Sequence, residues 1–461
     1  MRKRVGYWRT LRVGIAVGVV VGSGACGGDD DAPPITPPPT NRDSGQLPEP
    51  WDAAVQRPDA GTPYVPPGEP EPGLAGNCAV DSNKIYDVAE RSTPFMSTPL
   101  AVDPISSGFA LPYVASGACL DAVHWASLEG AAHGGEPESA VAIDACALVR
   151  DAVASPIGQH WLLASIDTRD ANPYDIWVGT YSGKVMKPSS GQRISENTRV
   201  ETGLALTTLR DSSAVLLAYA DEDLQLGQSL HVQPLDSDGK PRGDAVTIES
   251  SDTLYYQSLT LRQLGQNGAA LAYVRYTLDY TRSEIVFVAL DADGKPLRDA
   301  WVLAGNAGPS ASVDVSVDGE GGGIVYSRAE ASIGRQVWFQ QIDSNGEAAL
   351  QRNGTSRAPA LRIVNSPARG IDVSMTKLRT SFLVTYRALP TGNETRAKVR
   401  LYFLDRYGAV IGSSDVSYTS NAGGRTAIQS ANDGRVVVSW NQVNDDGTST
   451  IKVVRLPCVG G

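Results

Sequence analysis

The sequence predicts an all-β repeat fold, and three observations lead to this prediction. A phrase that ends in glycine, Leu-Asp-x-Asp-Gly in its clearest form, returns every 52 to 62 residues. Short apolar runs precede each copy. Helical periodicity is nearly absent after the N-terminal segment. A fixed period of about 50 residues indicates a repeat architecture, and the strands within one period decide which architecture it is.

The marker phrase counts the repeats. Seven copies have their glycines at spacings of 53, 56, 55, 52, 62 and 52 residues. The clear copies are Leu235–Gly239, Leu290–Gly294, Ile342–Gly346 and Leu404–Gly408, and the weaker ones are Leu128–Gly130, Tyr181–Gly183 and Leu456–Gly460. Asp-x-Asp-Gly supplies the positive φ that a tight hairpin turn needs. The phrase therefore predicts one polar turn in each of seven units.

Each unit contains four predicted strands. The second strand is a continuous apolar run such as Val215–Tyr219, which suits burial on both faces. The third strand alternates and ends in the marker, as in Ser229–Leu235. Fourth strands are predicted at Asp244–Ile248 and Asp299–Leu303, and a first strand at Ser258–Arg262. Seven consecutive units of four antiparallel strands predict a seven-bladed β-propeller, with six or eight blades as alternatives.

The two ends of the repeat array complete each other. The last unit stops after its third strand, and the segment Lys84–Glu90 precedes the first unit with no partner of its own. Pairing these two strands would close the ring and remove two exposed sheet edges.

The cysteines fit this closure. Four follow Cys26, and an even number in an exported protein predicts disulfides. Cys78 precedes the closing strand and Cys458 lies at the end of the strand that pairs with it, so a Cys78–Cys458 disulfide is expected. A second disulfide is expected between Cys119, which follows the second strand of the first unit, and Cys146, which comes just after its fourth strand. Four free thiols are the alternative. A metal role is not predicted, because no CxxC pair occurs.

The N-terminal segment resembles the signal of bacterial lipoproteins. Residues 1–25 have a basic start and a short apolar stretch, and then Ser23-Gly24-Ala25-Cys26 is similar to a lipobox, although Ser23 stands where that family usually has leucine. The resemblance implies that Cys26 is acylated and becomes the first mature residue. In this family an Asp directly after the cysteine favours retention in the inner membrane. This chain has Gly27 at that position, so the resemblance implies that the protein is anchored in the outer membrane. An ordinary signal peptide with an unmodified cysteine is the alternative.

The next segment predicts a tether. Residues 27–77 hold 13 of the 29 prolines, mixed with Gly, Asp and Thr. This composition indicates an extended spacer with no packed core. The predicted organisation is therefore a signal at 1–25, a tether at 26–77 and a propeller at 78–461.

The net charge narrows the classes of molecule that the protein can bind. Removal of the signal takes away five basic side chains and moves the net charge from −11 to about −16. An acidic body argues against nucleic acid or anionic lipid as a partner. We expect a monomer that meets a membrane only through its lipid anchor.

A search for chemistry finds no local motif. The four histidines form no HExxH pair, and GxSxG and P-loop patterns are missing. Asp314–Gly319 copies the first half of a calcium loop, but its twelfth position is Val325, so a polar turn is preferred. The sequence therefore predicts no metal, no cofactor and no assignable catalytic residue.

Long polar connections between second and third strands predict a functional face. They lie at 167–174, 275–282, 388–395 and 441–449 and open on one side of the ring. The favoured interpretation is a surface-tethered, non-enzymatic protein that binds an envelope or extracellular protein or glycan there. The alternatives are a secreted propeller hydrolase or lyase acting on polysaccharide, and a structural envelope component. Two carboxylates near an aromatic platform at the channel mouth would favour the enzyme.

Overall fold

The computed structural model resolves the chain into two units, residues 1–57 and 58–461. It describes residues 78, 80, 85–91, 101–102, 109–116, 121–128, 138–157, 160–169, 174–182, 191–195, 200–209, 214–223, 227–265, 267–308, 310–318, 320–330, 334–350, 356–364, 369–389, 397–419, 426–431, 434–443, 448–456 and 458. The predicted signal and tether, with Cys26, lie outside these residues. Among the described residues there is no helix that is long and apolar enough to cross a membrane.

The described part folds into seven four-stranded antiparallel sheets. Blade 1 is β2 (Ala101–Val102), β3 (Phe109–Ser116), β4 (Asp121–Ser127) and β5 (Glu138–Ala147); blade 2 is β6 (Val149–Ile157), β7 (His160–Asp167), β8 (Asp175–Tyr181) and β9 (Gln192–Arg193). Blade 3 is β10 (Val200–Thr208), β11 (Val215–Asp223), β12 (Gly227–Leu235) and β13 (Val246–Ser251); blade 4 is β14 (Leu254–Leu264), β15 (Gly268–Thr277), β16 (Ser283–Leu290) and β17 (Trp301–Gly305). Blade 5 is β18 (Ser312–Asp318), β19 (Gly321–Glu330), β20 (Gly334–Asp343) and β21 (Leu361–Arg362); blade 6 is β22 (Arg369–Leu378), β23 (Ser381–Leu389), β24 (Ala397–Leu404) and β25 (Val410–Thr419). Blade 7 is β26 (Thr426–Ser430), β27 (Val436–Val443), β28 (Ser449–Leu456) and, as its outer strand, β1 (Ile85–Arg91).

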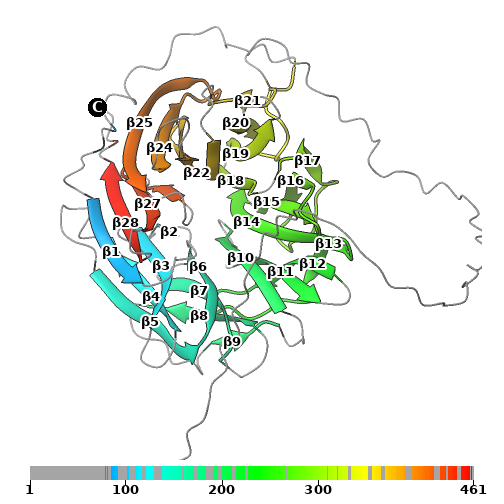
Figure 1. The fold of residues 1–461 in the computed structure, drawn as a ribbon. Coiled ribbons are helices and arrows are strands. Elements are labelled where there is room, and N and C mark those ends of the chain that lie inside the picture. The colour runs from blue at the N-terminus through cyan, green and yellow to red at the C-terminus, as the bar shows by residue number, and fades with distance from the viewer. Residues whose placement is uncertain are drawn as a thin grey trace, which may run out of the picture. The chain divides into compact units, whose positions relative to one another are not determined.

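The seven sheets are the blades of a β-propeller, as the repeat predicts (Figure 1). Blade 7 shows the predicted closure, because β1 pairs antiparallel with β28 from Ile85–Val454 to Arg91–Ser449. A disulfide joins Cys78 to Cys458 across a sequence separation of 380 residues. The ring is therefore closed both by a sheet and by a covalent bond.

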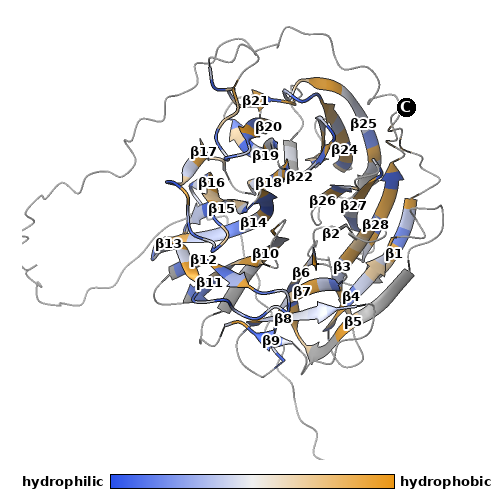
Figure 2. Ribbon diagram, turned by 180° about the vertical axis from the view of Figure 1, so that it is seen from behind, coloured by the Kyte–Doolittle hydropathy of each residue, from blue (hydrophilic) through white to orange (hydrophobic). Residues whose placement is uncertain are grey.

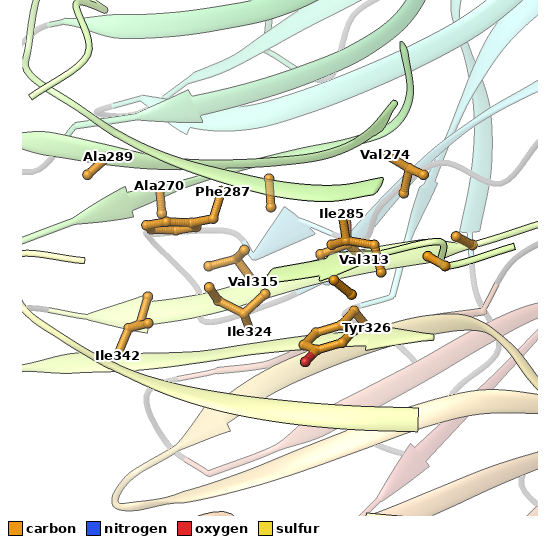
Figure 3. Packing of buried hydrophobic residues seen from close by; sticks show 14 of the residues in the cluster. Ala270, Val274, Ile285, Phe287, Ala289, Val313, Val315, Ile324, Tyr326 and Ile342 are labelled. Carbon is orange, nitrogen blue, oxygen red and sulfur yellow. The ribbon is translucent and has the colours of Figure 1, made fainter. Parts of the chain in front are cut away.

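The core is divided among the interfaces between blades. The described apolar side chains fall into seven buried clusters, and each cluster joins two neighbouring blades. Between blades 4 and 5, Phe287 and Ile285 of β16 lie opposite Val315, Ile324 and Tyr326 of blade 5 (Figure 3). Orange, apolar segments recur along the strands around the ring (Figure 2). Burial on both faces explains the continuous apolar second strands.

The marker phrase forms the same turn in four blades. In the blade 3 turn, the Asp236 carboxylate accepts hydrogen bonds from the backbone N–H groups of Asp238 and Lys240 at 2.9 and 2.8 Å, and Gly239 has a φ of +82°. The turns that begin at Asp291, Asp343 and Asp405 repeat both bonds. A β-carbon on each of these glycines would meet a third-strand side chain of the preceding blade, namely Val178, Val232, Phe287 or Phe339. The marker glycine is therefore required by its backbone angle and by the packing between blades.

Two predicted strand positions need correction. The fourth strands β13 and β17 begin at Val246 and Trp301, two residues later than expected. The chain first forms a bridge between Leu235 and Pro241, or between Leu290 and Pro296, and then bends before it joins the sheet. Cys146 lies inside β5 and not after it. Cys119 and the side chain of Cys146 lie outside the described residues, so their predicted bond stays a prediction.

Candidate functional site

The ring has two different faces. The marker turns lie on one of them, which we call the turn face. The first strand of each blade starts at the opposite face, which we call the mouth face. The connections between second and third strands lie on the mouth face too. In blade 5, for example, Ser312 at the start of β18 pairs with Ser327 near the end of β19.

A cavity opens on the channel near the mouth face. Its volume is about 80 Å³, and it is lined by residues of six first strands, β6, β10, β14, β18, β22 and β26. Its charged residues are Asp151, Arg262, Asp314 and Asp372, which come from four different blades. We call this the channel-mouth cavity.

Asp314 links three blades beneath the opening. Its carboxylate accepts hydrogen bonds from the Thr260 hydroxyl at 2.9 Å, from the Ser374 hydroxyl at 2.8 Å and from the Met375 backbone N–H at 2.9 Å. Arg262 Nη2 lies 3.8 Å from Oδ1 of the same carboxylate. First strands of different blades share no sheet, so these side-chain bonds replace a backbone ladder. Asp314 therefore orients the cavity wall.

Asp372 occupies a backbone bulge at the rim. Its φ is +53°, which is uncommon for a residue other than glycine. Ser258 has a φ of +54° within the corresponding bulge of blade 4, and Gly203 a φ of +73° in blade 3. Bulges of this kind re-aim side chains, and left-handed residues other than glycine concentrate at functional sites. The strain at Asp372 and Ser258 therefore marks the rim as a candidate site.

Two buried arginines surround Asp372. Arg387 Nη2 lies 2.8 Å from its carboxylate. Burial lowers the pKa of the Arg335 guanidinium, and Tyr276 and Asp372 oppose that shift. Arg335 also donates a hydrogen bond to the Ala307 carbonyl at 3.1 Å. The Asp372 carboxylate thus lies in a positive environment at the edge of the cavity.

An aromatic group lies on the same face in blade 4. Tyr280, in the turn between β15 and β16, is 54% exposed and has its ring centre 4.6 Å from that of Tyr255. The ring of Tyr255 stacks on Tyr276 at 5.5 Å. The Tyr276 hydroxyl donates to the Ala311 carbonyl at 3.1 Å, directly before Ser312 of the cavity wall. A supported, exposed aromatic ring is therefore connected to the cavity rim.

The structure separates the other predicted features from this cavity. Cys78 and Cys458 lie at the turn face, where a β-carbon on Gly434 of a neighbouring turn would be 3.7 Å from the Cys458 carbonyl oxygen. His124, His160 and His231 lie in three different blades, and His133 is outside the described residues. Of the four long connections, only 275–282 is described in full. The polar turn expected at Asp314–Gly319 forms only at the end of that segment, where Asp318 pairs with Gly321 and accepts the Glu320 N–H at 2.8 Å. Asp314 itself lies within β18 and faces Thr260 and Ser374.

Sequence reasoning missed Asp151, Asp314 and Asp372. Asp151 and Asp372 are lone carboxylates in an acidic protein with no local motif around them, and the calcium-loop pattern that begins at Asp314 does not indicate its place in the cavity wall. Register within the repeat could have found Asp314, because Thr260 and Ser374 lie 54 and 60 residues away, about one period in each direction.

Comparison with known proteins gives a likeness of fold. No family model and no curated protein matches this chain. The α-L-arabinofuranosidase Arb93A from Fusarium graminearum is 12% identical, with a TM-score of 0.42, over 67% of this chain and 92% of that one. The endosialidase of phage phi92 is 8% identical, with a TM-score of 0.44, over 81% and 68%. Prolyl oligopeptidase B from Galerina marginata is 10% identical, with a TM-score of 0.45, over 80% and 48%.

These comparisons correct the favoured interpretation of the sequence. The expectation of a non-enzymatic binding protein is corrected, because the three solved structures are named as an α-L-arabinofuranosidase, an endosialidase and a prolyl oligopeptidase, which agree better with the enzyme alternative. The expectation relied on the lack of a catalytic motif. In a propeller, residues from separate blades meet only after folding, so that lack carries little weight. Identities of 8 to 12% show the fold alone and assign no substrate.

Proposed function

We propose that this chain is an exported propeller enzyme that cleaves polysaccharide at the channel mouth, by hydrolysis or by elimination. The observation that carries the proposal is that Asp151, Asp314 and Asp372 line one cavity together with Arg262. Cleavage of a glycosidic bond by hydrolysis needs one carboxylic acid to protonate the leaving oxygen and a second carboxylate to act as nucleophile or base.

The two rim carboxylates are our candidates for this pair. Asp151 and Asp372 both lie at a register shift near the start of their first strands, between Val149 and Asp151 in β6 and between Ile371 and Ser374 in β22. Asp314, with its hydrogen bonds from Thr260, Ser374 and Met375, has a positioning role. Tyr280 offers its ring as a platform for a sugar unit next to the rim.

The test measures product release from a panel of neutral and acidic polysaccharides. Reducing ends report hydrolysis, and the ultraviolet absorbance of an unsaturated product reports elimination. We expect Asp151→Asn and Asp372→Asn each to lower kcat by a factor of about 100 or more, since loss of a general acid or base has this effect. Tyr280→Ala should raise KM more than it lowers kcat.

The matched control is Asp244→Asn, which removes an exposed carboxylate on the turn face and should leave the rate unchanged. Wild-type protein that releases no product from any polysaccharide, or Asp151→Asn and Asp372→Asn variants with the wild-type rate, would contradict the proposal.

We further propose that the enzyme is a monomer anchored to the outer membrane through an acylated Cys26. Support comes from the lipobox-like segment and from the place where the chain joins the ring. Cys78 is bonded to Cys458 on the turn face, so the chain enters the ring on the face opposite the channel mouth. Wild-type protein should take up a labelled fatty acid, and Cys26→Ser should not. A Cys26→Ser protein that still takes up label and stays with the membrane fraction would overturn the anchor.

A further inference from the structure

The turn face holds a second cavity, between the outer halves of blades 4 and 5. Its volume is about 270 Å³, and Phe287, Ala289 and Trp301 form its apolar floor. The Phe287 and Trp301 rings meet edge to face, with centres 6.3 Å apart. A larger open cavity beside it shares Arg298 and Glu347. We call the smaller one the turn-face pocket. An apolar cavity of about 150 Å³ can hold a benzene ring, so this pocket is large enough for an aromatic side chain.

Comparison of the repeats within the chain shows that several residues lining this pocket differ from their counterparts in the other blades. Four residues after the marker glycine, blade 3 has Gly243 and blade 4 has Arg298. Seven residues after it, blade 3 has Val246 and blade 4 has Trp301. Blade 5 places Glu347 directly after its marker glycine, where blades 3 and 4 have lysine. The turn itself needs none of these changes, since its backbone bonds are the same in all three blades.

The rim carries charges of both signs. Glu347 is bridged by Arg298 Nη1 at 2.8 Å and by Arg357, and Asp299 is exposed beside them. The side chains of Arg298, Arg357 and Glu347 are 34, 51 and 42% exposed. Ion pairs this exposed contribute little to folding. A ligand can therefore exchange partners with them at small cost.

We propose that the turn-face pocket binds an aromatic α-amino acid, with the ring on Trp301 and Phe287. The carboxylate would pair with Arg298 and Arg357, and the ammonium group with Asp299 and Glu347. The lining contributes two positive and two negative side chains, which suits a zwitterion better than a single charge. An apolar floor with a few convergent polar groups is the usual composition of a small-molecule site. This proposal is independent of the chemistry at the channel mouth.

The test is calorimetric titration of the full chain with four probes: L-phenylalanine, 3-phenylpropionate, phenethylamine and L-alanine. We expect L-phenylalanine to bind at least tenfold more tightly than either singly charged analogue, and L-alanine to give no measurable heat. Trp301→Val gives blade 4 the residue of blade 3 and should weaken binding at least tenfold. Asp299→Asn should weaken the binding of L-phenylalanine but not the binding of 3-phenylpropionate.

Two matched controls separate a local effect from a global one. Asp244→Asn changes the blade 3 counterpart of Asp299 and should leave binding unchanged, as should Asp372→Asn at the mouth. Equal affinity for L-phenylalanine and 3-phenylpropionate would contradict the recognition of both charges of a zwitterion. No binding of L-phenylalanine, or unchanged binding to Trp301→Val, would overturn the site.

Discussion

The two faces of the ring are built on different principles. On the turn face, four blades repeat one local device, in which an aspartate accepts two backbone N–H groups and a glycine adopts a positive φ. At the mouth face, the cavity wall differs in every blade and is joined by side chains that lie 54 to 61 residues apart. The turn face is therefore encoded locally, whereas the mouth exists only after the blades have assembled.

This difference indicates at which positions substitutions are tolerated. A turn that satisfies its own backbone tolerates new side chains around it, as Arg298 and Trp301 in blade 4 illustrate. A wall residue such as Asp314 has partners on two other blades, so its replacement affects three blades at once. Stability should thus depend on the closure and the marker glycines, and activity on the mouth.

The largest effect is expected at the closure on the turn face. The chain-entropy model gives a loss of about 6 kcal/mol when a loop of 380 residues is opened, and real disulfides often deliver less. Cys458→Ser should therefore lower the free energy of unfolding by several kcal/mol, measured by urea denaturation. Cys78→Ser should have the same effect, and the double variant should add nothing. A Cys458→Ser midpoint equal to that of the wild type would show that the β1–β28 pairing alone closes the ring.

The closure is also the part that the sequence predicted most fully. A strand missing at one end and a strand left over at the other require each other, so counting alone led to β1, β28 and the Cys78–Cys458 bond. The start of the fourth strands was harder to predict, because the bend after Pro241 and Pro296 depends on how the turn joins the sheet.

The second prediction separates backbone angle from packing on the turn face. Gly408 and Gly434 both have a φ of +88°. A β-carbon on Gly408 would come within 2.3 Å of Phe339, whereas one on Gly434 would meet nothing closer than 3.7 Å. Gly434→Ala should cost about 1 kcal/mol for the strained angle. Gly408→Ala should cost about 2 kcal/mol more, because the core between blades is overpacked. Equal urea midpoints for the two variants would contradict the packing role of the marker.

The candidate site was less predictable than the scaffold. Periodicity shows which residues are buried, but Asp151 and Asp372 are single carboxylates that share a cavity only in the folded ring. The positive surroundings of Asp372 come from Arg387 and Arg335, which lie on other strands. The positions of the two carboxylates relative to one another depend on the curvature of the ring. The aromatic group at Tyr280 could be expected only as part of a long connection.

The third prediction concerns the wall of the mouth. Asp314→Ala would leave the Thr260 and Ser374 hydroxyls and the Met375 N–H without their acceptor. Buried donors that lose a partner cost about 1–3 kcal/mol, so unfolding should become easier by about 2–3 kcal/mol. The exposed turn variant Asp236→Ala, which loses two backbone bonds in solvent, should cost less. If Asp236→Ala were the more destabilising of the two, the contrast between the faces would be wrong.

The smallest effect tests whether the mouth face also contains a turn of the local kind. Hydrogen bonds from the Thr277 hydroxyl and from the backbone and hydroxyl of Thr281 lower the pKa of Asp279 to about 2. A depressed folded pKa means that the ionised form orders the turn at neutral pH, and this contribution is lost as the pH falls from about 4 through about 2. Titration of the Asp279 carboxyl followed by NMR should have its midpoint near 2, and the Tyr280 ring should lose its contact with Tyr255 over the same range. Asp279→Asn should show neither transition. A midpoint near 4 would mean that this turn is not held by its own aspartate, and that the mouth face owes its order to contacts between blades throughout.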